Sequence, residues 1–341
     1  MIQIDGSHGE GGGQIIRTAL TLSLATGTPF CVSHIRAGRK RPGLLKQHLT
    51  AVKAAAEIGH ASTQGADLHS RSLVFEPGEV TPGDYHFSIG TAGSSTLVLQ
   101  TLLPVLLTAG GPSTLRLEGG THNAYAPPFD FVDEAFLPLV NRLGPTCTAT
   151  LDRRGFYPAG GGKLQVTIQP STELERLDLI EPGSARDVSA RAIVSRLPRH
   201  VAERELKVLA TQLGLRNRQT EVVEDTTSPG PGNAVVVVIR SETATEVVTS
   251  FGSKGVPAER VAKEAAQETQ AYLDAAVPVG SHLADQLLVP LALGSGGSYV
   301  TLPPTAHTKT NAETIQKFLD VSISMSERDD QSFLIEVGRS Q

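Results

Sequence analysis

His307 stands in the segment whose residue types most suggest phosphate chemistry. Pro303-Pro304 ends the β-like run 298–302, because proline lacks the N–H group that a sheet ladder needs. Thr310 and Glu313 follow in the S/T-x-x-E spacing of a capping box, which predicts a helix start. His307 is therefore expected on a stiff loop just before a helix N-terminus, where free N–H groups and the helix dipole favour phosphate.

The imidazole of His307 could act there as an acid, a base or a nucleophile. The alternative is a solvated loop histidine without a chemical role, and this segment alone favours that alternative. Whether the rest of the chain supplies a matching phosphate site decides between the two.

A glycine loop with the sequence GEGGGQ, residues 9–14, precedes a predicted helix. It is not a P-loop, because no Gly-Lys-Ser/Thr follows, and Gln14 replaces the third glycine of G-x-G-x-x-G. Its N–H groups can still approach an anion. Glu10 either holds a divalent metal beside a phosphate or is only a partner of the helix dipole, and spacing leaves both open.

A basic turn follows the next predicted strand. The turn and the polar residues near it in the sequence are Arg36, Arg39, Lys40, Arg41, Arg17 and Gln47. Most charge runs are solvated faces, but Gly38 and Pro42-Gly43 fix this backbone, and arginine favours bidentate phosphate contacts. Residues 1–50 hold six basic residues against two acidic ones, while the whole chain carries −5. This distribution indicates a focused anionic ligand rather than bulk adhesion to nucleic acid.

Three further segments carry polar groups that could bind a ligand. HLADQ, residues 282–286, opens a predicted helix, the proline-stiffened loop 119–128 contains His122, and Gln100 lies in a helix without charges. Each has a structural alternative: Asp285 as a dipole partner, His122 as a structural histidine and Gln100 as a satisfied core amide. Taken singly, these alternatives are the commoner ones.

The elements that position these segments recur as strand, loop, helix, glycine, strand, loop and helix. This order occurs three times without strict sequence identity, which predicts a structural repeat. The predicted helices are 14–25, 43–58, 96–107, 129–143, 283–293 and 312–319.

A different segment, residues 182–278, lies between the second and third copies and is flanked by Pro/Gly/Ser-rich patches. It reads as a strand, a helix, two alternating strands and a helix. We therefore predict an α+β fold of layered sheets and helices. Residues 1–181 and 279–341 would form a large domain, with a smaller α+β domain inserted at 182–278.

The composition is typical of a globular protein with more than one domain, since the chain has 341 residues, of which 39% are hydrophobic. Cys31 and Cys147 are the only cysteines, so neither a disulfide framework nor a cysteine zinc site is predicted, and a reducing, cytoplasmic location fits. We expect no secretory signal and no membrane span: the uncharged stretch 88–115 contains Gly, Ser, Thr, Gln100 and Pro104. Aromatic residues make up 4% and Trp is absent, so base stacking is not expected as the main binding mode.

Six motifs together resemble those of the RNA 3′-terminal phosphate cyclase family. They are DGSHGEGGGQIIRTAL, IRAGRKRPGLLKQHL, GGTHNAYAPPFDF, RRGFYPAGGG, HLADQ and HTKTNAETI, in this order. They span nearly the whole chain outside the predicted insert. The resemblance implies a large domain of three βαβαββ-like units, each a sheet backed by two helices and similar to the C-terminal domain of translation initiation factor three. It also implies a thioredoxin-like insert.

The resemblance further implies an ATP-dependent reaction, in which an RNA 3′-phosphate and ATP give an RNA 2′,3′-cyclic phosphate, AMP and pyrophosphate. The family's histidine, which matches His307, attacks the α-phosphate of ATP and carries AMP. AMP then passes to the RNA 3′-phosphate, and the vicinal 2′-OH displaces it. The implied ligands are ATP, Mg²⁺ or Mn²⁺, and an RNA with a 3′-phosphate end. A protein partner is not evident, and a homodimer stays open.

Other site residues follow by their match to the family's motifs. The matches to the adenylate pocket are Gln100, Pro127, His282, Leu283, Ala284, Asp285 and Gln286. Those to the phosphates of ATP and the RNA end are Arg17, Arg36, Arg39 and Gln47, and Glu10 matches the metal-binding carboxylate. The family commonly has tyrosine where this chain has His282, whose imidazole can still stack on adenine.

Two other functions were weighed against the cyclase. A non-catalytic RNA-binding ribosome-assembly factor shares the fold but lacks the nucleophile, so His307 and HLADQ argue against it. An enolpyruvyl-transferring enzyme shares the repeat but has a second domain of three units, for which this chain shows no further copies.

Overall fold

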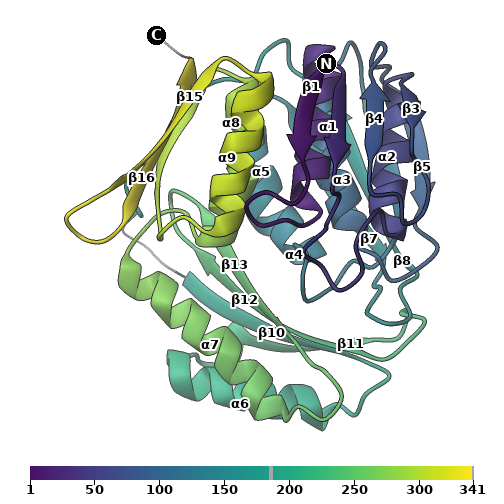
Figure 1. Cartoon of the computed structure of the whole chain (residues 1–341). Helices are drawn as coiled ribbons and strands as arrows, with labels where there is room; N and C mark the ends of the chain where they lie inside the picture. The colour runs from purple at the N-terminus through teal and green to yellow at the C-terminus, as the bar shows by residue number, and fades with distance from the viewer. Residues whose placement is uncertain (184–186, 340–341) are drawn as a thin grey trace.

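The computed structural model describes residues 1–183 and 187–339. The predicted domain ranges also include 184–186 and 340–341, which lie outside the described residues. Over the described ranges the chain forms a mixed α/β fold of four four-stranded sheets backed by helices (Figure 1). Each sheet contains both parallel and antiparallel pairs.

The first sheet has the strand order β1-β2-β4-β3. Its strands are β1 (Ile2–Asp5), β2 (Phe30–Ser33), β3 (Ser62–Gln64) and β4 (Leu73–Glu76), and its helices are α1 (Gln14–Thr26) and α2 (Lys46–Ile58). The predicted helix 14–25 is confirmed. It ends because Gly27 takes a left-handed backbone with φ of 67°, which disfavours residues with a Cβ. The predicted helix 43–58 begins three residues later, at Lys46.

The second sheet has the order β5-β6-β8-β7. Its strands are β5 (Asp84–Ser88), β6 (Ser113–Gly119), β7 (Thr146–Arg153) and β8 (Gly162–Gln169). Its helices are α3 (Ser95–Leu106) and a broken helix of α4 (Phe129–Phe131), a π-helical segment η1 (Val132–Phe136) and α5 (Leu137–Asn141). Every residue of α3 except Gln100 is buried, as a helix without charges requires.

The third sheet has the order β9-β14-β16-β15. Its strands are β9 (Leu177–Leu179), β14 (Gly297–Thr301), β15 (Val321–Glu327) and β16 (Phe333–Arg339), and its helices are α8 (Ser281–Leu293) and α9 (Ala306–Phe318). In all three sheets the first strand pairs parallel with the second, and the fourth lies antiparallel between the second and the third.

The third copy starts earlier in the chain than the sequence suggested. Its outer strand is β9, which precedes the segment 182–278, rather than the residues around Val279. Val279 forms a single parallel bridge to Thr301, at the end of the same strand β14. The chain therefore leaves the edge of this sheet after β9 and returns to the same edge before α8, a long-range pairing that a three-residue strand does not reveal in the sequence.

The fourth sheet belongs to the intervening segment and has the order β11-β10-β12-β13. Its elements are β10 (Asp187–Ser195), α6 (His200–Leu213), the short 3₁₀ helix η2 (Asn217–Gln219), β11 (Thr220–Asp225), β12 (Gly232–Arg240), β13 (Thr245–Phe251) and α7 (Ala258–Ala275). Both faces of β12 are buried. Val235, Val237 and Ile239 join the apolar cluster under α6 and α7, while Ala234, Val236 and Val238 join the main core. This explains the continuous apolar run of the strand.

The described residues contain no helix that is both long and apolar enough to cross a membrane.

Candidate active site

His307 lies in the first turn of α9, not on a loop ahead of it. The helix begins at Ala306, because the hydroxyl of Thr305 accepts a hydrogen bond from the Thr308 N–H at 3.2 Å. The predicted capping box at Thr310 is therefore wrong. His307 is still placed at a helix N-terminus, where backbone N–H groups and the dipole attract anions.

The residues of the expected capping box contact the glycine loop instead. The hydroxyl of Thr310 accepts a hydrogen bond from the Glu10 N–H at 3.0 Å. The carboxylate of Glu313 accepts one from Nε2 of His8 at 2.7 Å. These two contacts fasten the loop 6–13 along α9 and bring Glu10 next to His307.

Gln14 orients the His307 ring. Its Nε2 donates to Oδ1 of Asp285 at 2.6 Å, so its Oε1 faces His307 Nδ1 at 2.8 Å. Since Oε1 can only accept, Nδ1 must carry the proton. The lone pair of a neutral His307 then sits on Nε2, the ring nitrogen that a nucleophile would use.

Asp285 is the buried end of the hydrogen-bonded chain Asp285–Gln14–His307, called the relay below. Besides Gln14, Asn311 donates to its Oδ1 at 3.1 Å and Gln286 donates to its Oδ2 at 3.2 Å. Burial raises the pKa of the Asp285 carboxyl, an effect opposed by the hydrogen bond from Gln14 and the charges of His307 and Arg17. Because three amide N–H groups converge on the carboxyl, it acts as an acceptor in every side-chain contact and fixes the direction of the relay.

A second chain of amides joins α1, α3 and α8 behind the relay. Arg17 donates from Nε to Gln100 at 3.0 Å, and Gln100 donates to Gln286 at 2.8 Å. Burial lowers the pKa of Arg17 to about 10, partly offset by Asp285, so the guanidinium stays charged near pH 7. A cavity of about 20 Å³ lined in part by these residues has room for about one water molecule, not for an adenine.

Glu10 and Arg39 form an ion pair on the Nε2 side of His307. Nε2 lies 3.8 Å from Oε1 of Glu10, whose side chain is 9% exposed. The other carboxylate oxygen, Oε2, is buried and has no hydrogen-bond partner among the described residues. An orphaned buried oxygen of this kind is what a bound cation or a ligand N–H would satisfy.

A metal ion bound by Glu10 would need further ligands. No group of three or more His, Cys, Asp or Glu residues in the described ranges is arranged to hold a metal ion. Mg²⁺ is commonly bound by one or two carboxylates together with substrate phosphates and water. Glu10 with its unpaired oxygen fits a metal of that type and does not fit a resident metal held by protein ligands alone.

The surroundings lower the pKa of His307 below its ordinary value of 6.5. Partial burial is the main cause, Asp285 acts in the opposite direction, and the charges of Arg17 and Arg39 add to the lowering. The side chain is 54% exposed, so a ligand can still reach it. At neutral pH the ring is therefore uncharged and accessible, as a nitrogen nucleophile must be.

Arg36 and Gln47, the other two residues matched to phosphate binding, make contacts of their own. Arg36 donates from one nitrogen to the carbonyl groups of Arg41 and Gly43, at 2.7 and 2.8 Å, and so closes its own turn. Gln47, on α2, accepts the Ser94 N–H at 3.0 Å, at the start of α3. Arg17 and Arg39 thus lie near enough to lower the pKa of His307, while Arg36 and Gln47 make contacts within the adjoining loops.

HLADQ divides between the core and the site. Leu283 and Ala284 are 0% and 1% exposed and pack in the main core, so only their backbone could touch a nucleotide. Asp285 and Gln286 face the amide network described above. His282 is exposed and lies 3.6 Å from Glu268 of α7.

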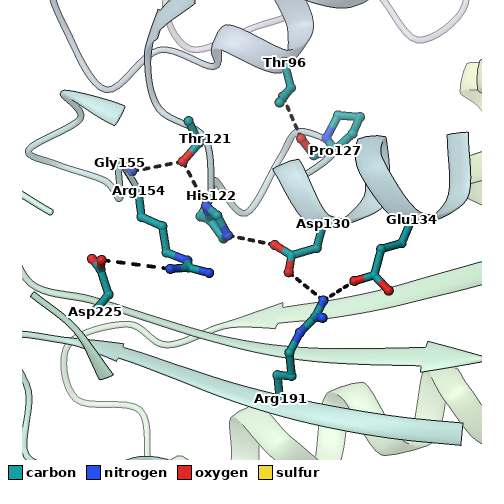
Figure 2. A network of polar contacts seen from close by, with 10 residues as sticks. All are labelled: Thr96, Thr121, His122, Pro127, Asp130, Glu134, Arg154, Gly155, Arg191 and Asp225. Atoms are coloured by element: carbon teal, nitrogen blue, oxygen red, sulfur yellow. Dashed lines mark hydrogen bonds and ion pairs between the residues drawn. The ribbon is translucent and has the colours of Figure 1, made fainter. Parts of the chain in front are cut away.

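Pro127 lies on the loop between β6 and α4, and its carbonyl accepts a hydrogen bond from Thr96 at 2.6 Å. Figure 2 shows how the rest of this loop is held. His122 is fully buried and donates from Nε2 to Asp130 at 2.9 Å, and Arg191 of β10 donates to the same carboxylate at 2.7 Å. His122 is thus a structural residue that ties the second sheet to the fourth.

Comparisons with known proteins show the family of this chain. A family model described as RNA 3′-terminal phosphate cyclase matches residues 8–325. The chain belongs to the RNA 3′-terminal phosphate cyclase family. It is 52% identical over 329 residues to the RNA 3′-terminal phosphate cyclase of Koribacter versatilis, covering 96% of this chain and 93% of the relative.

Other relatives of the family match to a similar extent. Identity is 49% over 331 residues with the RNA 3′-terminal phosphate cyclase of Ralstonia nicotianae, covering 96% and 94% of the two chains. It is 45% over 337 residues with that of Salmonella enteritidis, covering 99% and 98%. Among solved structures, EPSP synthase from Acinetobacter baumannii matches at 10% identity and a TM-score of 0.30, over 94% of this chain and 62% of that one.

Sequence reasoning missed three residues at or near the candidate site. Gln14 was noted only because it breaks a glycine motif, and Asn311, which also accepts a hydrogen bond from Thr18 at 2.8 Å, was not noted at all. His48 is buried, and burial together with Arg36 and Arg17 lowers its pKa to about 3. Polar residues on the otherwise apolar faces of two helices are the one sequence signal that could have revealed Gln14 and Asn311.

Proposed function

We propose that this chain converts the 3′-terminal phosphate of an RNA to a 2′,3′-cyclic phosphodiester at the expense of ATP. One observation supports the proposal most: His307 is uncharged, half-exposed and held by Gln14 with its lone pair on Nε2, beside Glu10 and Arg39. The names of the relatives point to the same reaction.

In the first step, Nε2 of His307 attacks the α-phosphorus of ATP. A P–N bond forms, the P–O bond to the β-phosphate breaks, and pyrophosphate leaves with the bonding electrons. As positive charge develops on the ring, the Nδ1–H group donates more strongly to Gln14, and Asp285 supports that amide from behind. Arg17 and Arg39 counter the negative charge of the phosphates.

The next two steps pass AMP on and then release it. An oxygen of the RNA 3′-phosphate attacks the phosphorus of the histidine-bound AMP, the P–N bond breaks, and a mixed anhydride forms. The vicinal 2′-OH then loses its proton and attacks the 3′-phosphorus, and AMP leaves. ATP is needed because AMP is a far better leaving group than oxide. Arg36 and Gln47 would hold the RNA end near the active histidine.

The nucleotide would lie against HLADQ and the Pro127 loop. His282 would stack on adenine, and Gln100 with Asp285 and Gln286 would set the shape of the pocket behind it. Glu10 would hold Mg²⁺ or Mn²⁺ together with the ATP phosphates, and such an ion neutralises phosphate charge. The wholly buried side chains of Leu283 and Ala284 restrict those two residues to backbone contacts.

We also propose a domain division for the large and small parts of the chain. The three sheets of like strand order would be the three repeated units, assembled from residues 1–181 and 279–341. Residues 182–278 would be an inserted domain of thioredoxin-like topology. The chain leaves one edge of the third sheet after β9 and returns to the same edge at Val279, which supports this division.

The test uses a single-stranded RNA with a 3′-phosphate, incubated with the protein, ATP and Mg²⁺ or Mn²⁺. We expect the terminal phosphate to become resistant to phosphatase only when ATP is present. The matched control carries a 2′-deoxy terminal nucleotide, which can accept AMP but cannot cyclise, so it should accumulate as the adenylated RNA. Resistance that forms without ATP would refute the proposal.

A further inference from the structure

Two exposed tyrosines lie on neighbouring loops, and the proposed chemistry gives neither side chain a role. Tyr125 is 98% exposed in GGTHNAYAPPFDF, and Tyr157 is 78% exposed in RRGFYPAGGG. They are the only strongly exposed aromatic side chains in the part of the chain that the structure describes. Phe156, next to Tyr157, is 2% exposed, so the chain buries one ring here and presents the next to solvent.

The two loops are joined by their backbones. The N–H groups of Thr121 and His122 both donate to the carbonyl of Gly155, at 2.9 and 3.1 Å. The Gly155 N–H returns a hydrogen bond to the hydroxyl of Thr121 at 3.0 Å (Figure 2). The ring of His122 lies 5.2 Å from that of Phe156. The two loops are therefore held together as one unit, called the tyrosine loops below, and their backbones fix where the two tyrosines leave the surface.

The unit is braced from the other side by the intervening segment. Asp130 holds His122, and Arg191 of β10 holds Asp130 and Glu134 (Figure 2). An aromatic ring on a fixed backbone loses little freedom when it binds a partner, so preorganisation of this kind favours binding.

The unit contacts the loop 90–94, which leads into α3. Asn123 donates to the carbonyl of Ala92 at 2.8 Å. A Cβ on Gly160 would come within 2.7 Å of the same residue, so the backbones meet there. The other end of the loop 90–94 is held by Gln47, which accepts the Ser94 N–H. Both tyrosine loops thus share a support with a residue proposed to bind the RNA end.

The surroundings of the two rings suit nucleobases better than a protein. The other large apolar side chains exposed in the described ranges are Met1, Leu68 and Leu197, none of them in the tyrosine loops, whereas a protein interface needs a contiguous apolar centre. Isolated, exposed aromatic rings are the kind of surface on which single-stranded nucleic acids stack, since every base has a face that can stack.

We propose that Tyr125 and Tyr157 form a stacking platform for the unpaired bases at the 3′ end of the RNA substrate. The inference rests on the proposed function and adds to it: cations and the reacting histidine hold the terminal phosphate, and the platform holds the bases that precede it. Stacking does not depend on base identity, so the platform accepts RNA ends of different sequence.

The test measures equilibrium binding of a fluorescent single-stranded RNA with a 3′-phosphate, without ATP, so that no chemistry is required. We expect Tyr125→Ala and Tyr157→Ala each to weaken binding roughly 5- to 150-fold, and the phenylalanine variants to bind as the wild type does. Leu197→Ala, which removes an exposed apolar side chain elsewhere, is the matched control. Self-adenylation with ATP alone reports that each variant is folded.

A second RNA, abasic at its terminal nucleotides, separates stacking from other effects. It should bind the wild type and the double alanine variant equally. Unchanged binding of the base-containing RNA to the double variant would overturn the platform and leave a protein partner as the reason for the exposed rings. An equal loss on both RNAs would overturn it as well. A wild type that binds RNA but never cyclises it would refute the proposed function alone.

Discussion

Replacing Gln14 by methionine should slow the transfer of AMP to the protein while leaving ATP binding almost unchanged. Methionine keeps the length of the side chain but cannot accept from the Nδ1–H group of His307, which Gln14 does at 2.8 Å. The substitution also removes the hydrogen bond of 2.6 Å that the Gln14 amide donates to Asp285. The imidazole then loses both its orientation and its fixed tautomer.

The size of the effect follows from the hydrogen bond that is lost. Leaving a partly buried N–H group unpaired costs about 1–3 kcal/mol. At about 1.4 kcal/mol for each factor of ten, the rate falls roughly 5- to 150-fold. Gln316→Met is the matched control, because Gln316 lies on the exposed face of α9, the helix that carries His307, and makes one long hydrogen bond, 3.3 Å, to Val321.

The assay is a single-turnover measurement of labelled AMP transfer to the protein at saturating ATP. It should be repeated across pH, since a tautomer effect lowers the rate at every pH, whereas a change in pKa moves the midpoint. A Gln14→Met variant within about twofold of the wild-type rate would refute the relay, because that difference corresponds to less than the weakest hydrogen bond considered.

Three further predictions follow from charges at the site and the braced loop. Because the neutral form of His307 reacts, the rate of AMP transfer should fall as the pH drops through the pKa of His307, which lies below 6.5. Arg39→Gln removes a positive charge that lowers this pKa, so it should move the midpoint of the pH–rate profile to higher pH. Burial acts to raise the pKa of Asp130, but His122 and Arg191 lower it to about 2, so Asp130→Asn should lower the free energy of unfolding by about 2 kcal/mol at pH 7. The loss should shrink as the pH falls from about 4, where the carboxyl of the unfolded chain takes up a proton, to about 2, where that of the folded protein does, and chemical denaturation at several pH values would measure it. Glu10→Gln should raise the Mn²⁺ concentration needed for half-maximal AMP transfer roughly tenfold or more. Electron paramagnetic resonance, with an ATP analogue that cannot react, should show a matching loss of Mn²⁺ binding. Unchanged Mn²⁺ binding would exclude Glu10 as a ligand.

Much of the fold could be predicted because its signals are local. The helix α1 was predicted to within one residue, because apolar spacing and Gly27 act within a few residues of each other. The start of α9 was missed because two threonines compete to cap it. Thr305 caps the helix, because Thr310 accepts a hydrogen bond from the Glu10 N–H and Glu313 accepts one from His8. Glu10 and His8 lie about 300 residues earlier in the chain.

The site could be predicted only as far as its residue types allow. His307, Glu10, Arg17 and Arg39 carry charges or titrating groups in distinctive sequence motifs, and the structure brings them together. The role of Gln14 depends on Asp285, which lies 271 positions further along the chain, and on the direction in which a single amide points. Such a role is fixed by the packing of α1 against α9 and of α9 against α8, which no local pattern encodes.

The central claim is that His307 carries AMP. The most direct measurement incubates the protein with ATP labelled at the α-phosphate and Mg²⁺ or Mn²⁺, and maps the labelled peptide by mass spectrometry. We expect a label that is labile to acid and stable to alkali, located on His307, absent in His307→Ala and retained in His60→Ala, a variant of an exposed histidine outside the site. A wild type that takes up no label, or a label that persists in His307→Ala, would contradict the account.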